Sequence, residues 1–85
     1  MFQRGQAAEH SGNIEDARRF YRAAAPASQP GAALALGRLY DPAYLTGLGV
    51  IGGAFADPAE ARRWYERAAA LGVPEARALL TNLPR

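Results

Sequence analysis

One phrase occurs twice in this chain of 85 residues. Residues 15–25 read EDARRFYRAAA and residues 59–69 read AEARRWYERAA, so the second copy follows 44 positions after the first. The copies align without a gap, and Trp64 stands where the first copy has Phe20. Self-similarity over a few tens of residues is the sequence signature of helical repeat arrays. We therefore expect repeated helical hairpins.

Composition limits the class of protein further. The length suits one small domain. The chain has no cysteine, which excludes disulfides and thiolate metal sites. Its first residues lack the apolar run of a signal peptide, and the long uncharged stretch 42–56 is too short and glycine-rich to span a membrane. A cytoplasmic protein is expected, although a fragment of an exported protein would look the same.

The spacing of apolar residues predicts five helices and no sheet, because no segment alternates with period two. Asn13 can cap the second helix. Asp57, Pro58 and Glu60 form a strong start signal for the fourth helix, and Gly72 is suited to end it. The expected helices cover roughly 2–11, 14–25, 30–40, 58–71 and 74–83.

Two of these helices carry a clear apolar stripe. Phe20 and Trp64 are expected to contribute most to the core because aromatic side chains bury the largest area. The second helix is expected to bury Ile14, Ala17, Phe20, Tyr21 and Ala24, and the fourth Ala61, Trp64, Tyr65, Ala68 and Leu71.

The residues also follow a known family pattern, which runs Ala33-x2-Leu36-Gly37-x2-Tyr40, then Gly47-x-Gly49-Val50, then Asp57-x3-Ala61-x2-Trp64-Tyr65-x2-Ala68-Ala69-x2-Gly72-x3-Ala76. This pattern resembles a Sel1-like repeat, a relative of the tetratricopeptide (TPR) repeats. The resemblance implies an all-α fold of antiparallel helix-turn-helix repeats, an α–α solenoid. It also implies a protein-interaction scaffold or adaptor rather than an enzyme.

The resemblance divides the single helical-repeat domain, residues 1–85, into three parts. Residues 1–29 look like a partial TPR-like unit. Residues 30–73 are similar to one Sel1-like repeat with a lengthened loop at 41–56, and residues 74–85 form a terminal helix. The family tyrosine before the glycines is either Tyr40 or Tyr44, because about eight extra residues separate Tyr40 from Asp57.

The lengthened loop is the most unusual segment, since long loops without structure of their own are often functional. Its apolar residues favour either docking of a partner or self-association. The alternative is that the loop folds back over the end of the third helix, and this interpretation is slightly preferred. Its glycines match G-x-G-x-x-G but lack the strand and acidic residue of a dinucleotide site. The candidate contact residues are Tyr44, Leu45, Leu48, Ile51 and Phe55.

Arginines form a second candidate surface, because they recur in the repeated phrase and would make a basic stripe for nucleic acid or an acidic partner. Acidic residues lie three or four positions away, as Glu60 precedes Arg63 and Arg62 precedes Glu66. Ordinary exposed helix pairs are therefore the favoured interpretation. The arginines are Arg18, Arg19 and Arg22 in the first copy and Arg62, Arg63 and Arg67 in the second.

No residue pattern predicts catalysis, a cofactor or a metal. The single histidine, His10, has Glu9 beside it but no further ligand at a suitable spacing, so a surface histidine near a helix end is expected. Ser11 and Ser28 have no base placed to activate them.

The expected function is therefore recognition of a protein or peptide on a concave face built from the first, third and fifth helices. Arg38 and Arg77 are candidate contact residues on that face. The alternative is a self-associating assembly unit or a piece of a longer array, because stacks usually need three or more repeats. Binding of nucleic acid through the arginines is less favoured.

Overall fold

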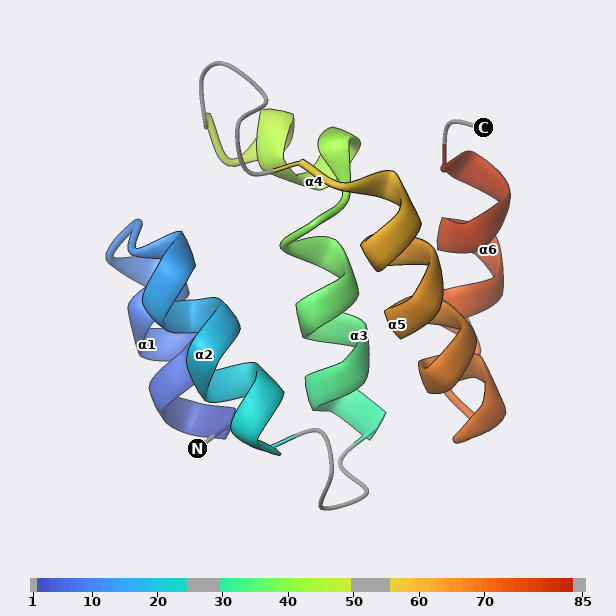
Figure 1. Ribbon diagram of the computed structural model, residues 1–85, viewed down its shortest axis with the longest axis horizontal. Helices are drawn as coiled ribbons and strands as arrows, with labels where there is room; N and C mark the ends of the chain where they lie inside the picture. The colour runs from blue at the N-terminus through green and yellow to red at the C-terminus, as the bar shows by residue number, and fades with distance from the viewer. Residues whose placement is uncertain (1, 25–29, 50–55, 84–85) are drawn as a thin grey trace.

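The computed structural model describes residues 2–24, 30–49 and 56–83. Within these ranges the chain forms six helices, which are α1 (Phe2–His10), α2 (Ile14–Ala24), α3 (Pro30–Arg38), α4 (Pro42–Gly47), α5 (Pro58–Ala70) and α6 (Glu75–Asn82). Helices α1 and α2 pack as one antiparallel pair and α3 and α5 as another, while α6 packs against α5 (Figure 1). The all-α class and its antiparallel packing are confirmed.

Helix α4 corrects the expectation of a loop over residues 41–56. Asp41 is its N-cap, because its carboxylate accepts a hydrogen bond of 3.0 Å from the backbone N–H of Ala43. Pro42 then occupies the first turn, where a missing N–H costs nothing. The dipeptide Asp41-Pro42 therefore follows the end of α3 and also begins α4. The local sequence indicates only that a helix ends there.

The predicted start signals of α2 and α5 are confirmed. The side chain of Asp57 accepts from the N–H of Glu60 at 3.2 Å, and that of Asn13 accepts from the N–H of Asp16 at the same distance. Gly72 follows α5 with a φ of 93°, a left-handed conformation that glycine adopts without strain. These caps fix the register of both repeated phrases.

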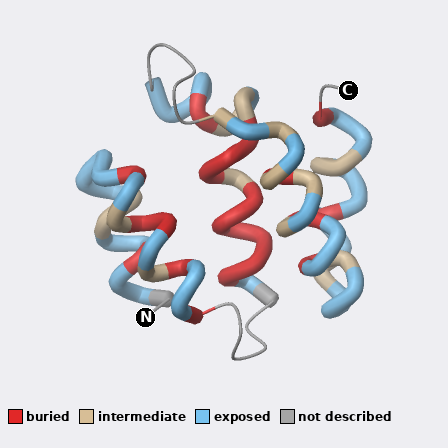
Figure 2. Tube along the Cα trace, in the orientation of Figure 1, coloured by how far each residue is buried: buried red, intermediate tan, exposed pale blue. Residues whose placement is uncertain are grey.

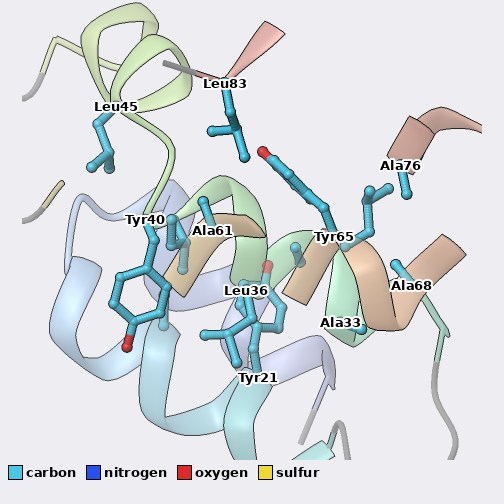
Figure 3. Close-up of a cluster of buried hydrophobic side chains, with 14 of the residues drawn as sticks. Tyr21, Ala33, Leu36, Tyr40, Leu45, Ala61, Tyr65, Ala68, Ala76 and Leu83 are labelled. Carbon is cyan, nitrogen blue, oxygen red and sulfur yellow. The ribbon is translucent and has the colours of Figure 1, made fainter. Parts of the chain in front are cut away.

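The core is centred on α3, which lies between the other helices and is buried along most of its length (Figure 2). Side chains from α2, α5 and α6 close around it (Figure 3). Leu36, Leu39, Tyr21 and Tyr65 are the largest side chains to be fully enclosed. One tyrosine from each repeated phrase, Tyr21 and Tyr65, is thus buried in this core.

Phe20 and Trp64 are not the most buried aromatics, and this corrects the expected core. Both are half-buried, while Tyr21 and Tyr65, their neighbours in sequence, are fully enclosed. The tyrosines are enclosed because each faces a glycine that lets a neighbouring helix come close. Leu71, expected in the stripe of α5, is 40% exposed because it is the C-cap residue beyond the last turn.

Tyr21 and Tyr65 lie against glycines of the helices that α2 and α5 pair with, α1 and α3. A Cβ built on Gly5 would lie 2.6 Å from ring carbons of Tyr21, and one on Gly37 would lie 2.6 Å from ring carbons of Tyr65. Each tyrosine hydroxyl donates a hydrogen bond of 2.8 Å to a carboxylate four positions after the glycine. The acceptors are Glu9 in the first pair and Asp41 in the second.

Candidate functional site

A groove runs between α1 and α3 and is bordered by Tyr44 of α4. Its volume is about 330 Å³, and we call it the α1–α3 groove. Helix α3 contributes residues spaced three, four and seven apart, which places them on one face of a helix. The lining residues are Gln6, Glu9, His10, Tyr21, Gly31, Leu34, Ala35, Arg38 and Tyr44.

A second hollow of about 320 Å³ adjoins this groove. Glu9, His10 and Tyr44 line both, so the depression continues on either side of the Tyr44 ring. Two apolar residues, Ile14 and Leu48, also line the second hollow, and Leu48 is 44% exposed. We call it the Leu48 hollow. A ligand in the groove therefore has space to extend past Tyr44.

Glu9 is the acceptor that joins these elements. Its Oε1 atom accepts a hydrogen bond of 2.8 Å from the hydroxyl of Tyr21, and its Oε2 atom accepts from the hydroxyl of Tyr44. Burial and the hydrogen bond to Glu9 raise the pKa of Tyr44 to about 12 and also raise the pKa of Tyr21. Both tyrosines are therefore neutral donors at neutral pH. Each carboxylate oxygen of Glu9 already has a partner.

Arg38 is the positive charge of the groove. It is half-buried at the end of α3, and its guanidinium carbon lies 5.8 Å from the centre of the Tyr44 ring. Across the described parts of the chain Arg38 forms no ion pair within 4.0 Å. A guanidinium over an aromatic face gains cation–π energy while its N–H edge stays available. Arg38 can therefore accept an anionic partner.

The remaining predicted contact residues do not gather at one place. Leu45 is 3% exposed and packs in the core, so its side chain is not accessible to a partner. Ile51 and Phe55 lie outside the described residues. Arg77 is exposed on α6, on the far side of the molecule from α1 (Figure 1). The predicted set thus reduces to Arg38, Tyr44 and Leu48 around the groove.

The arginine stripe is divided by the fold, which corrects its interpretation as an exposed face. Arg18 is 9% exposed, donates a hydrogen bond of 2.7 Å to the carbonyl of Leu39 and lies 4.1 Å from the centre of the Tyr40 ring. Arg22 donates to the Tyr40 hydroxyl. These arginines join α2 to α3 and support the fold.

Two of the ion pairs that the spacing predicted are confirmed, since Arg18 pairs with Glu15 and Arg63 with Glu60, each at 3.4 Å. Arg19, which the spacing also placed near Glu15, pairs with Asp16 instead. The expected pair between Arg62 and Glu66 is not formed within the part of the chain that the structure describes.

The groove itself is not indicated by the sequence, although Arg38 and Tyr44 were predicted contact residues. Gln6, Glu9 and His10 belong to a helix whose face was not assigned, and His10 was interpreted as a surface residue. One sequence pattern could have indicated how Tyr21 packs at the base of this region. Gly5 precedes Glu9 by four positions as Gly37 precedes Asp41, and this spacing marks the glycine that each tyrosine contacts.

Within the described residues, no cluster of three or more histidine, aspartate or glutamate side chains is placed to hold a metal ion. None of the described helices has the length and apolar character needed to cross a membrane. Comparison of the chain with protein-family models, with curated proteins and with solved structures gave no match.

Proposed function

We propose that the chain is a non-enzymatic interaction module of the Sel1-like type, which binds a segment of another protein in the α1–α3 groove. The observation that carries this proposal is Arg38, a groove-lining guanidinium with no ion pair among the described residues. The successive antiparallel helix pairs and the sequence pattern support a short solenoid. A cytoplasmic location is part of the proposal.

The shape of the groove supports binding of a peptide segment. Helices α1 and α3 form its walls, and the enclosed side chain of Tyr21 also lines it. A groove formed by packed helices is present before binding, so less ordering is needed when a ligand enters. Its lining combines apolar Leu34 and Ala35 with polar Gln6 and Arg38, the mixture that a peptide backbone with side chains requires.

Selection from a random peptide library on the immobilised chain tests the proposal. Amide resonances of the labelled protein are then followed as the selected peptides are added. We expect shifts at groove residues of α1 and α3, and weaker binding to Arg38→Ala than to the control Arg77→Ala. Shifts that map to α5 and α6, or a library that yields no peptide, would contradict the proposal.

Self-association is the second candidate function, and one observation favours it. Leu48 and Leu71 are large apolar residues that are 44% and 40% exposed. Light scattering over a range of concentrations tests this for the wild type and for Leu48→Ser and Leu71→Ser. A wild-type dimer that either variant loses would support self-association. A monomer at every concentration would exclude it under those conditions.

A further inference from the structure

We propose that the segment bound in the α1–α3 groove carries an acidic side chain that pairs with Arg38 and an apolar side chain that enters the Leu48 hollow. This inference rests on the proposed function and specifies its ligand. It follows from three properties of the groove: the available charge of Arg38, the occupied oxygens of Glu9, and the continuation of the groove past Tyr44.

Arg38 gains most from a carboxylate. A guanidinium carries five N–H donors in a planar fork that matches the two oxygens of a carboxylate. Its described contact is with the face of Tyr44, which leaves that edge for a ligand. Arg38 is half-buried, so an ion pair there is screened less than a pair on an open surface.

Glu9 is the competing anchor, because a basic ligand side chain would be drawn to its negative charge. Each oxygen of Glu9, however, already accepts a hydrogen bond from a neutral tyrosine hydroxyl. Those hydroxyls stabilise the carboxylate without a counter-charge from the ligand. The N–H groups of Arg38 have no such partner among the described residues. An acidic ligand therefore satisfies more unfilled hydrogen-bonding capacity than a basic one.

The continuation of the groove distinguishes an internal segment from a chain terminus. Because Glu9, His10 and Tyr44 line both hollows, a bound segment can pass Tyr44 instead of ending there. Beyond that ring it meets Leu48, which is 44% exposed. An extended segment presents alternate side chains to the same side, so an acidic residue followed by an apolar residue two positions away is the shortest motif that places both side chains toward the groove.

Four matched peptides test this motif, each acetylated and amidated on a Ser/Gly background. They carry Glu-x-Leu, Gln-x-Leu, Lys-x-Leu or Glu-x-Ser at the centre. Binding is followed by amide chemical shifts of the wild-type protein, so the peptide series does not depend on a variant that folds. We expect Glu-x-Leu to bind best, with shifts at Arg38, Tyr44 and Leu48. Replacing Glu by Gln is expected to weaken binding about 10-fold to 100-fold.

The variants Arg38→Gln and Arg77→Gln provide the protein side of the test, with folding checked by circular dichroism. Loss of binding in Arg38→Gln alone supports the inference. Equal loss in both variants would show non-specific attraction to positive charge and overturn it. Equal affinity for the Glu and Gln peptides also overturns it, as does tighter binding of the Lys peptide, which would make Glu9 the anchor.

Failure of the inference is distinct from failure of the proposed function. If none of the four peptides binds, the acidic–apolar motif is wrong. The groove is then judged by the random-library selection, which presumes no motif. A library peptide that occupies the groove without an acidic residue would retain the proposed function and overturn the inference.

Discussion

Tyr65 lies directly over Gly37, with its Cδ1 and Cε1 atoms 2.6 Å from the point where a Cβ on that glycine would stand. Real Cβ atoms are essentially never so close to another atom. The contact lets the axes of α3 and α5 approach, and the Tyr65 hydroxyl can then reach Asp41 at 2.8 Å. The absence of a Cβ on Gly37 therefore permits both the close packing of α3 against α5 and the hydrogen bond from Tyr65 to Asp41.

Gly37→Ala is expected to destabilise the fold by about 1–2 kcal/mol. Overpacking costs typically 1–3 kcal/mol, and the gain in helix propensity of up to ~1 kcal/mol offsets part of it. Gly47→Ala is the control, because a Cβ on this glycine of α4 would have no other atom within 4 Å. Urea unfolding gives the free energy of unfolding of both variants and of the wild type. Equal stability of the two variants would contradict this explanation of the close approach.

Tyr65→Phe is expected to cost about 1.5–3 kcal/mol, because it removes a hydrogen bond to the carboxylate of Asp41, which is 5% exposed. Tyr44→Phe is the comparison. Its acceptor, Glu9, keeps the hydrogen bond from Tyr21, so a smaller loss of about 0.5–1.5 kcal/mol is expected. Chemical unfolding of both variants gives the two values. A larger loss for Tyr44→Phe would reverse the proposed order.

Arg18→Met is expected to destabilise the fold by about 2–4 kcal/mol. The change keeps much of the side-chain volume but removes the hydrogen bond to the Leu39 carbonyl and the contact with the Tyr40 ring. Arg19→Met removes an exposed pair with Asp16 and is expected to cost at most ~1 kcal/mol. Thermal unfolding distinguishes these neighbours. Similar midpoints for both variants would show that burial of Arg18 contributes little.

Stability is expected to fall as the pH rises from about 10 to about 12. The pKa of Tyr44 is about 12 in the folded chain, against an ordinary value of 10.0, so folding favours the neutral phenol. This contribution is fully present below pH 10 and is lost as the pH approaches 12. Arginine stays charged throughout this range.

Urea midpoints measured over this range test the alkaline effect. Tyr44→Phe is expected to reduce the slope of stability against pH without abolishing it, because burial also raises the pKa values of Tyr21 and Tyr65. Ultraviolet absorbance of the phenolate follows the ionisation itself. An unchanged slope in Tyr44→Phe would show that its ionisation is not linked to unfolding.

Much of the fold could be predicted because the repeated phrase has strong local signals. Asp57-Pro58 and Asn13 mark the starts of α5 and α2 through caps that need no distant contact. Helix α4 was missed because six residues carry too little periodic signal, and Pro42 and Gly47 at its ends favour a loop interpretation.

Other features depend on neighbours that are distant in sequence. The same letters, Arg-Arg-aromatic-Tyr, occur in α2 and α5, yet Arg18 is buried and Arg62 is half-buried. Arg18 is enclosed because the turn that follows α3 lies beside it and presents the Leu39 carbonyl and the Tyr40 ring. The groove likewise forms between α1 and α3, so neither helix alone indicates it. Tertiary packing, not local propensity, decides these environments.

The hydrogen bond from Tyr44 to Glu9 links α4, which lies between α3 and α5 in the chain, to the first helix pair. In a linear repeat array neighbouring units are coupled only through their shared interface, and weakly coupled units can unfold one at a time. Here two polar contacts cross that interface: Tyr44 of α4 donates to Glu9 of α1, and Arg18 of α2 donates to the Leu39 carbonyl just after α3. Complete unfolding of the segment on either side removes a partner from both contacts. The two helix pairs are therefore expected to unfold together, with similar free energies of opening for the most protected amides of each pair.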